Sequence, residues 1–203
     1  MRPIRSSLLT TIALSASAFA ASCSTLGTGA SDSFTGSFTF SIKTVSTGTS
    51  VPGHLVQFLT IPGQSFQALS SGTSPSVVFG NMQMSGGGIT AQAVSGPFSP
   101  SSALGPVKLD STDFPGPGPF LMWANTFSPP TGIFCAVPQT DGSTILALNG
   151  HTDMFVLCQA DMSSTATNIR AVVYNATLSA YETGPETYNG NTCVPVDLVF
   201  TPV

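Results

Sequence analysis

Few residues in this chain of 203 could do chemistry: two histidines, nine carboxylates and four cysteines. His151 and Asp153 would share one strand face, as two metal ligands do, but zinc needs three or four ligands and no neighbour supplies the others. His54 follows the turn Pro52-Gly53, and His151 follows Asn149-Gly150, positions typical of exposed strand ends. We therefore predict no metal site and no cofactor.

Catalytic motifs are also missing. A G-x-S-x-G elbow is not formed, because Gly63-Gln64-Ser65-Phe66-Gln67 fails at its last position. A glycosidase needs two acids flanking a sugar bond, yet most acids here lie beside Gly, Pro, Ser or Thr in predicted turns. Gly86-Gly87-Gly88 lacks the helix and Lys of a phosphate-binding loop and is predicted to be a turn. No catalytic residue is assigned; the chain leans towards a non-enzyme, and a secreted carboxylate-dependent hydrolase is the alternative.

The charge of the chain limits its partners. Charged residues make up 7% of it, against roughly a quarter in an average domain. After residue 20 the cations are Lys43, Lys108 and Arg170, so this part carries a net charge of −6. A nucleic-acid binder needs clustered Lys and Arg. We therefore exclude nucleic acid as a partner and expect a polysaccharide, such as that of a cell wall, or a protein surface, such as a host protein.

The first twenty residues have the features of a secretory signal peptide. Arg2 and Arg5 precede an apolar run from Leu8 to Phe19, and Ala18-Phe19-Ala20 provides small residues for cleavage. The prediction is a signal peptide over 1–20 and one secreted domain over 21–203, located outside the cell or in the cell wall. No later stretch has the length of a transmembrane helix.

An alternative interpretation concerns Cys23. Ala20-Ala21-Ser22-Cys23 loosely fits the cleavage box of a bacterial surface lipoprotein, with Ala20 where Leu is expected. Cys23 would then carry lipid, which leaves three cysteines and an odd number to pair.

The residues between the candidate sites predict an all-β fold. Sixteen Pro and twenty Gly leave little room for helices, and short alternating runs are typical of half-buried strands. Phe34, Phe38, Phe40 and Ile42 share one parity and would face one side of a strand. We expect an antiparallel β-sandwich or barrel, held by disulfides. Further predicted strands are Leu55–Ile61, Ser76–Phe79, Ile89–Val94, Val107–Leu109, Phe120–Ala124, Ile169–Ala176 and Cys193–Thr201.

Two turn dipeptides predict a three-stranded meander. Asp141-Gly142 separates Ile133–Val137 from Thr144–Leu148, and Asn149-Gly150 separates that run from Thr152–Gln159. Both dipeptides suit tight hairpins because Asn, Asp and Gly tolerate positive φ.

In an oxidising compartment the four cysteines should form two disulfides. The meander disfavours Cys135–Cys158, because strands two apart lie roughly 9–10 Å from each other and bridged α-carbons within about 7 Å. Two patterns remain, and we favour Cys158–Cys193 with Cys23–Cys135. The first bond would tie the last strand to the meander, and the second would hold the mature N-terminus.

One modification is predicted from the sequence. Asn175-Ala176-Thr177 is an N-glycosylation acceptor. In a secreted eukaryotic chain with an exposed Asn175 we expect a glycoprotein; otherwise Asn175 is an ordinary strand-end residue.

The segment Ala91–Phe120 is rich in Gly-Pro steps, including Phe114-Pro-Gly-Pro-Gly-Pro-Phe120. It is interpreted first as a stiff connector. The functional alternative is a rigid loop that presents Phe114, Phe120 and Trp123 as a ligand contact, because aromatic rings stack on sugars, although they fill cores more often.

The end of the chain resembles a known family. Phe155-Val-Leu-Cys158 is followed by a polar stretch, an apolar run Arg170-Ala-Val-Val-Tyr174 and a closing Cys193-Val-Pro-Val-Asp-Leu198. This order resembles the C-terminal third of a family of small secreted fungal proteins of unknown function, cell-surface or host-facing. The family often has Trp where this chain has Met154-Phe155. The resemblance implies a Cys158–Cys193 disulfide, a β-rich fold and no known activity.

Overall fold

The computed structural model describes residues 23–61, 64–71, 78–95, 107–110, 120–121, 123–125, 134–161, 170–176 and 187–203. These ranges contain strands and one short 3-10 helix, η1 (Cys23–Leu26). None of their helices is long and apolar enough to cross a membrane. The predicted leader over 1–20 lies outside the described residues.

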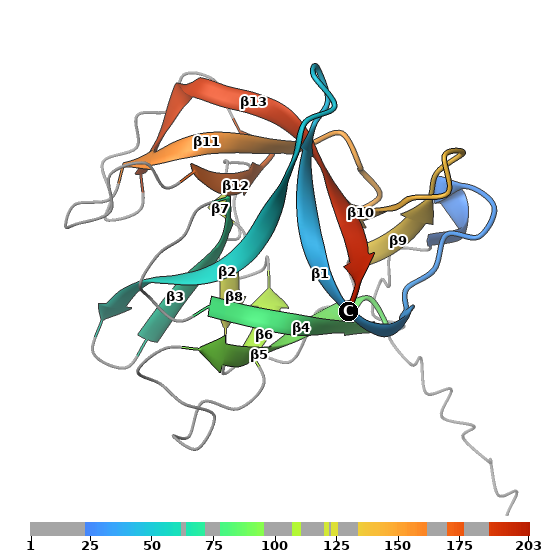
Figure 1. Cartoon of the computed structure of the whole chain (residues 1–203), viewed down its shortest axis with the longest axis horizontal. Helices are drawn as coiled ribbons and strands as arrows, with labels where there is room; N and C mark the ends of the chain where they lie inside the picture. Colours follow the sequence, from blue (N-terminus) through green and yellow to red (C-terminus); the bar gives the residue numbers. More distant parts are fainter. Residues whose placement is uncertain are drawn as a thin grey trace, which may run out of the picture.

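The strands form a sheet in which every pairing is antiparallel (Figure 1). In chain order they are β1 (Phe34–Thr44), β2 (Ser50–Ile61), β3 (Gln64–Ser70), β4 (Val78–Ser85), β5 (Gly88–Ser95), β6 (Val107–Asp110), β7 (Phe120–Leu121), β8 (Trp123–Asn125), β9 (Phe134–Pro138), β10 (Thr144–Leu148), β11 (Phe155–Asp161), β12 (Arg170–Tyr174) and β13 (Thr187–Pro202).

Six of these strands close into a barrel. The pairing runs β1-β2-β3-β12-β11-β13 and returns to β1, where β13 pairs from Phe38↔Pro202 to Thr44↔Val196. β4, β5, β6 and β8 extend the sheet on one side, and β10 and β9 extend it on the other. The all-β prediction is confirmed, and of its two forms the barrel is the one that occurs.

The core is built from one side of β1. Phe38, Phe40 and Ile42 are no more than 1% exposed, and Phe34 packs against the same cluster. The ring of Phe200, on β13, lies 4.6 Å from the Phe38 ring centre and 5.1 Å from that of Phe40. The shared parity predicted for the four β1 residues is confirmed, since alternate side chains of a strand face the same side.

Two glycines allow these strands to approach. Gly36 has φ +85°, a left-handed conformation that L side chains rarely adopt, and it lies where the pairing of β1 with β4 shifts between Phe34 and Phe38. A Cβ at Gly53, on β2, would lie 3.0 Å from the carbonyl oxygen of Phe40 on β1. Pro52, Gly53 and His54 lie inside β2, so the turn predicted at Pro52-Gly53 and the exposed strand end predicted at His54 are wrong. Gly53 is needed for the close approach of β1 and β2.

The meander prediction is half wrong. β9 and β10 form the expected hairpin, and Asn149-Gly150 forms the expected tight turn with φ of +51° and +84°. After that turn, however, β11 does not pair with β10; β13 lies between them and pairs with both. The dipeptide determines only the local turn. The long C-terminal strand β13, which pairs along both of its edges, lies beside β10 instead of β11.

Other strand predictions need smaller corrections. Ile169–Ala176 is a strand, β12, as its β-branched content indicates. The run Phe120–Ala124 is not one strand: β7 pairs with β12, whereas β8 pairs with β6. β3 was not predicted; its sequence, QSFQALS, has weak alternation, and its pairing with β2 shifts register.

The structure contains the disulfides Cys23–Cys135 and Cys158–Cys193, with Cα–Cα distances of 5.7 and 4.1 Å. This is the connectivity that the sequence favours. The prediction that one strand separates Cys135 from Cys158 is wrong, because both β10 and β13 lie between β9 and β11.

Candidate binding face

The histidine and carboxylate at the Asn149-Gly150 turn form a surface pair. His151 Nδ1 lies 3.8 Å from Asp153 Oδ1, and their side chains are 49% and 83% exposed. Across the described residues, no three or more His, Cys, Asp or Glu side chains gather as metal ligands would. The arrangement can make a weak surface ion pair when His151 is protonated.

Tyr174 lies close to this turn but belongs to the core. Its hydroxyl donates to the carbonyl oxygen of Leu148 over 2.9 Å, and the residue is 5% exposed. Burial, and then the charge of Asp153, raise the pKa of Tyr174 above its ordinary 10.0. A phenol held neutral by burial is a structural donor to the backbone, not an acid poised for catalysis.

The glycine run forms the predicted turn between β4 and β5. Gly87 N donates to Asp32 O and Gly86 N to Ser33 Oγ, over 2.6 and 3.3 Å. Gly87 O accepts from Phe134 N over 3.0 Å. These backbone groups join the β4–β5 hairpin to β9 and to the chain before β1, so they are not available to a phosphate.

The predicted aromatic contact is only partly placed. Phe120 lies on β7 beside β12, and Trp123 lies on β8 beside β6. Phe114 and the side chains of Phe120 and Trp123 lie outside the described residues. The contact therefore stays a prediction. Among the aromatic side chains whose burial is described, none is exposed.

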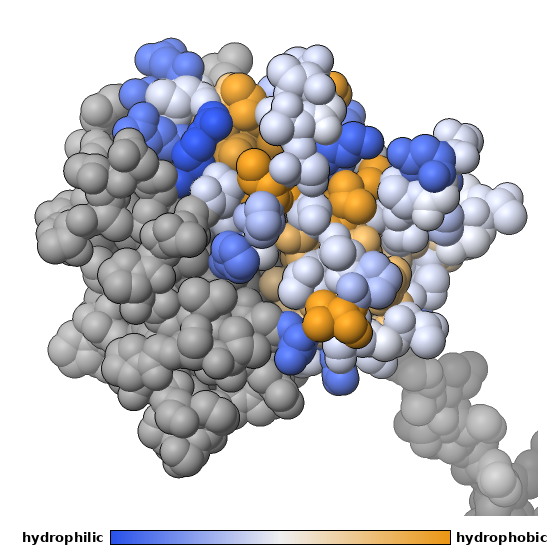
Figure 2. All heavy atoms as spheres, viewed as in Figure 1, coloured by the Kyte–Doolittle hydropathy of each residue, from blue (hydrophilic) through white to orange (hydrophobic). Residues whose placement is uncertain are grey.

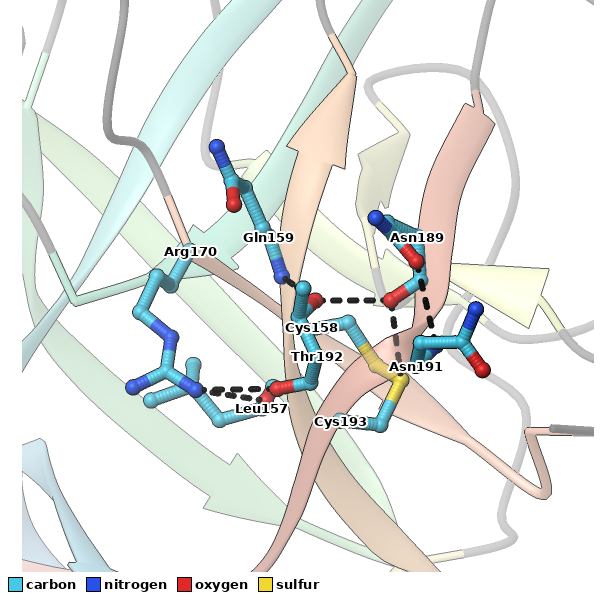
Figure 3. The surroundings of a disulfide bond; sticks show 8 residues. All are labelled: Leu157, Cys158, Gln159, Arg170, Asn189, Asn191, Thr192 and Cys193. Atoms are coloured by element: carbon cyan, nitrogen blue, oxygen red, sulfur yellow. Dashed lines mark hydrogen bonds between the residues drawn. A yellow bond between two sulfur atoms is a disulfide. The ribbon is translucent and has the colours of Figure 1, made fainter.

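Figure 3 shows the surroundings of the Cys158–Cys193 disulfide, where Arg170 joins three strands. From β12, Arg170 Nη2 donates to the carbonyl oxygens of Leu157, on β11, and Thr192, on β13, over 3.3 and 3.1 Å. The guanidinium thus supplements the disulfide in holding β13 against β11.

At the same junction, a side chain replaces a backbone hydrogen bond that the sheet lacks. The pairing of β11 with β13 shifts between Leu157 and Gln159, and Thr192 Oγ1 fills the gap by accepting from Gln159 N and donating to Asn189 O. Cys193 Sγ lies 3.7 Å from Asn189 O; since a disulfide sulfur has no proton to donate, this is a packing contact. The junction is structural.

Among the described residues, the outer side of β1 carries a regular row of polar side chains. Its odd-numbered residues Ser37, Thr39, Ser41 and Lys43 are half-buried and point away from the core. On β13, Thr201 lies opposite Thr39, Val199 opposite Ser41 and Asp197 opposite Lys43. On β2, Pro52 lies opposite Ser41 and Ser50 opposite Lys43. We call this surface the hydroxyl face; its members are Ser37, Thr39, Ser41, Lys43, Ser50, Pro52, Asp197, Val199 and Thr201.

The hydroxyl face combines hydrogen-bonding groups with few charges. Ser41 Oγ and Thr201 Oγ1 lie 2.9 Å apart, so one hydroxyl donates to the other and both keep lone pairs for a ligand. Lys43 Nζ lies 3.8 Å from Asp141 Oδ2 and stands across the strand from Asp197. In the view of Figure 2 the described surface is mostly pale, with separate hydrophobic and hydrophilic patches.

The hydroxyl groups continue into the loop that joins β1 and β2. Thr47 Oγ1 donates to the Oγ1 of Thr44 or Thr49, over 3.1 and 2.9 Å, and Thr44 Oγ1 donates to Thr49 O. Val45 N donates to Pro195 O over 3.1 Å. These bonds hold the loop against β13, so the hydroxyl face has a firm backbone.

Comparisons with family models, with curated proteins and with solved structures found no match for this chain. The resemblance to secreted fungal proteins therefore stays a prediction, and the function must be argued from the site. The hydroxyl face was not predicted from the sequence, because the candidate residues there were aromatic or titratable. The available signal was the alternation of Ser and Thr with Phe along β1.

Proposed function

We propose that the protein is exported, is not an enzyme and binds an uncharged polysaccharide outside the cell, in the extracellular space or the wall. The hydroxyl face carries this proposal. It offers hydroxyl donors and acceptors on neighbouring strands, and its described cation lies next to two acids. Such a surface suits the hydroxyl groups of a neutral sugar chain better than a charged ligand.

The test is a glycan array of the mature protein, followed by titration of the best neutral glycan. Ser41→Asp places a charge at the centre of the hydroxyl face and should weaken binding about tenfold or more, a cost of about 1.4 kcal/mol. Asn191→Asp is the matched control, because Asn191 is exposed on the opposite end of β13. Absence of binding to every neutral glycan, or equal loss in the two variants, would contradict the proposal.

A protein partner is the second candidate, favoured by one observation. Val45, in the loop between β1 and β2, is 60% exposed, and a partner that buried this apolar side chain would gain binding free energy. If the array shows no binding and Val45→Ser lowers capture of a cell-surface protein, this candidate replaces the first.

The hydrolase alternative receives no support from Asp141. Hydrogen bonds from the side chain and backbone of Ser143 lower the pKa of Asp141 below its ordinary 3.8, whereas a general acid needs a raised pKa. We infer that binding, not hydrolysis, is the activity to test first.

Export is supported by the cysteines. Two disulfides are typical of an oxidising compartment. Cys23 Sγ is bonded to Cys135 Sγ, and one sulfur cannot also carry the thioether lipid of a lipoprotein. Mass spectrometry of the secreted protein should find an unmodified N-terminus at Ala21; a diacylglycerol adduct on Cys23 would reverse this inference.

A glycan on Asn175 and a fungal origin complete the proposal. Asn175 directly follows β12, is exposed and has φ +54°. Its backbone N donates to Met154 O, so the backbone is held while the side chain faces solvent. A fungal origin is implied by the family that the C-terminal third resembles. Glycosidase treatment of protein from a fungal host should lower its mass, and Asn175→Gln should remove that change; an unchanged mass would show the acceptor to be idle.

A further inference from the structure

One edge of the sheet ends at β9 and is covered by the chain that precedes β1 and, at Phe134, by the turn between β4 and β5. Phe134 N donates to Gly87 O over 3.0 Å, and Ala136 N donates to Ser31 O over 2.8 Å. Pro138, the next residue of that parity, has no N–H. The outward donors of β9 are thus either bonded or absent, and Ser31 N in turn donates to Ala136 O over 3.0 Å. An uncovered edge of this kind is a template for another strand.

The outer side of β9 and β10 is buried under the same segment. Cys135 is 1% exposed, Val137 6%, Ile145 7% and Ala147 0%. The residues that pack over them include Cys23, Leu26 and Ala30. Figure 1 shows η1 beside β9, separated from the barrel by that strand. Because β9 and β10 also contribute Phe134, Leu146 and Leu148 to the main core, they are apolar on both faces.

The Cys23–Cys135 disulfide is the covalent link between this cover and the strand it covers. Without that link, the segment 23–33 is held to β9 only by non-covalent contacts. A displaced segment would leave an apolar, uncharged strand pair in which the N–H and C=O of Ala136 have lost their partner, Ser31. Phe134–Val137 and Ile145–Leu148 contain no charged residue, so nothing in them opposes pairing with an identical strand.

We propose that β9 and the outer side of β10 form a latent self-association surface, which the disulfide-tethered segment 23–33 keeps closed. The partner is a second copy of this chain, whose β9 pairs antiparallel with the first in a two-fold arrangement. A dithiol reductant would open the surface: its two thiols become one disulfide, while Cys23 and Cys135 each gain an electron and a proton. This role is independent of the binding proposed above.

The second disulfide provides a matched control. Cys158–Cys193 joins β11 and β13, and each of these strands already has a neighbour on both edges. Loss of that bond removes a covalent link but uncovers no strand edge.

The experiment compares wild type with Cys23→Ala/Cys135→Ala and Cys158→Ala/Cys193→Ala, by light scattering and hydrogen exchange. At low concentration the first variant should exchange the amide proton of Ala136 about tenfold faster than wild type, whereas that of Phe134, bonded to Gly87 O, should change little. At concentrations on the order of 100 μM the variant should dimerise, and the Ala136 amide should regain protection. The second variant should stay monomeric.

Should Cys23→Ala/Cys135→Ala fail to fold, the Cys158→Ala/Cys193→Ala variant treated with dithiothreitol supplies the same measurement, because Cys23–Cys135 is its remaining disulfide. Opening of the Ala136 amide together with dimerisation supports the proposal. Unchanged protection at Ala136 after loss of the bond would overturn it, as would a folded, opened variant that stays monomeric. Equal dimerisation of the untreated Cys158→Ala/Cys193→Ala variant would also overturn it, because the effect would then be general destabilisation.

Discussion

The two sides of β1 differ in what surrounds them. Phe38 and Phe40, at even positions, are 0% and 1% exposed and contact Phe200. Thr39 and Ser41, at odd positions, are half-buried; Thr39 lies opposite Thr201 of β13, and Ser41 lies opposite Pro52 of β2. One strand therefore contributes the core with one parity and the proposed binding surface with the other. Substitutions at adjacent positions should separate stability from binding.

The largest expected effect is on the inner side. Phe38→Ala removes a fully buried ring that contacts Phe34, Phe40 and Phe200, and should lower the free energy of unfolding by about 3–5 kcal/mol. Thr39→Ala, one residue along, should change it by less than about 0.5 kcal/mol. Denaturant unfolding of both variants measures this difference. Similar losses would show that the odd side of β1 is also part of the core.

A smaller loss is expected where β2 crosses β1. Gly53→Ala adds a Cβ about 3.0 Å from the Phe40 carbonyl oxygen and 3.2 Å from Cγ1 of Ile42, so the backbones must separate. We expect a cost of about 1–3 kcal/mol. Ser50→Ala, on an exposed position of the same strand, is the control and should be nearly neutral. If Gly53→Ala unfolds at the same denaturant concentration as wild type, the close approach is not needed.

A third substitution, at Tyr174 on β12, measures the stability contributed by a part of the core away from β1. Tyr174→Phe removes the hydrogen bond to Leu148 O, but that oxygen keeps the bond donated by His151 N, so the cost should be only about 0.5–1.5 kcal/mol. The raised pKa adds a pH dependence. Because the neutral phenol is favoured in the folded state, its contribution is complete below the unfolded pKa of 10.0 and is lost as pH rises through the higher folded value.

Thermal unfolding between pH 9 and 11 would detect this loss. Wild type should lose stability more steeply than Tyr174→Phe over that range. Parallel curves for the two proteins would mean that Tyr174 ionises as easily in the folded as in the unfolded state.

The sequence pattern predicted those features of the fold that depend on interactions between neighbouring residues. The parity of Phe34, Phe38 and Phe40 depends on strand geometry alone, and Asn149-Gly150 forms its turn because both residues tolerate positive φ. Both features were predictable from a few neighbouring residues. The fold class followed in the same way, from repeated short alternating runs.

Long-range choices were not predictable. Several strands could have paired with β10, and the selection of β13 depends on barrel closure, which involves residues more than forty positions away. The hydroxyl face was missed for a related reason: its residues come from β1, β2 and β13, and no single stretch of sequence brings Ser41, Pro52 and Thr201 together. Only the pairing register shows that they share a surface.

The smallest expected effect belongs to the outer side, at the ion pair beside the hydroxyl face. Hydrogen bonds from Ser143, and to a lesser degree the charge of Lys43, lower the pKa of Asp141 below 3.8. A depressed carboxyl pKa stabilises the fold above the unfolded value, and this stabilisation is lost as pH falls through the folded value. Asp141→Asn should therefore lower stability slightly at neutral pH, because Asp141 is exposed, and the difference from wild type should disappear as pH falls below about 4. Acid titration of unfolding for wild type and Asp141→Asn measures it. A large loss in Asp141→Asn at neutral pH would contradict the division between the two sides of β1, since an exposed pair would then carry the stability that we assign to the buried phenylalanines.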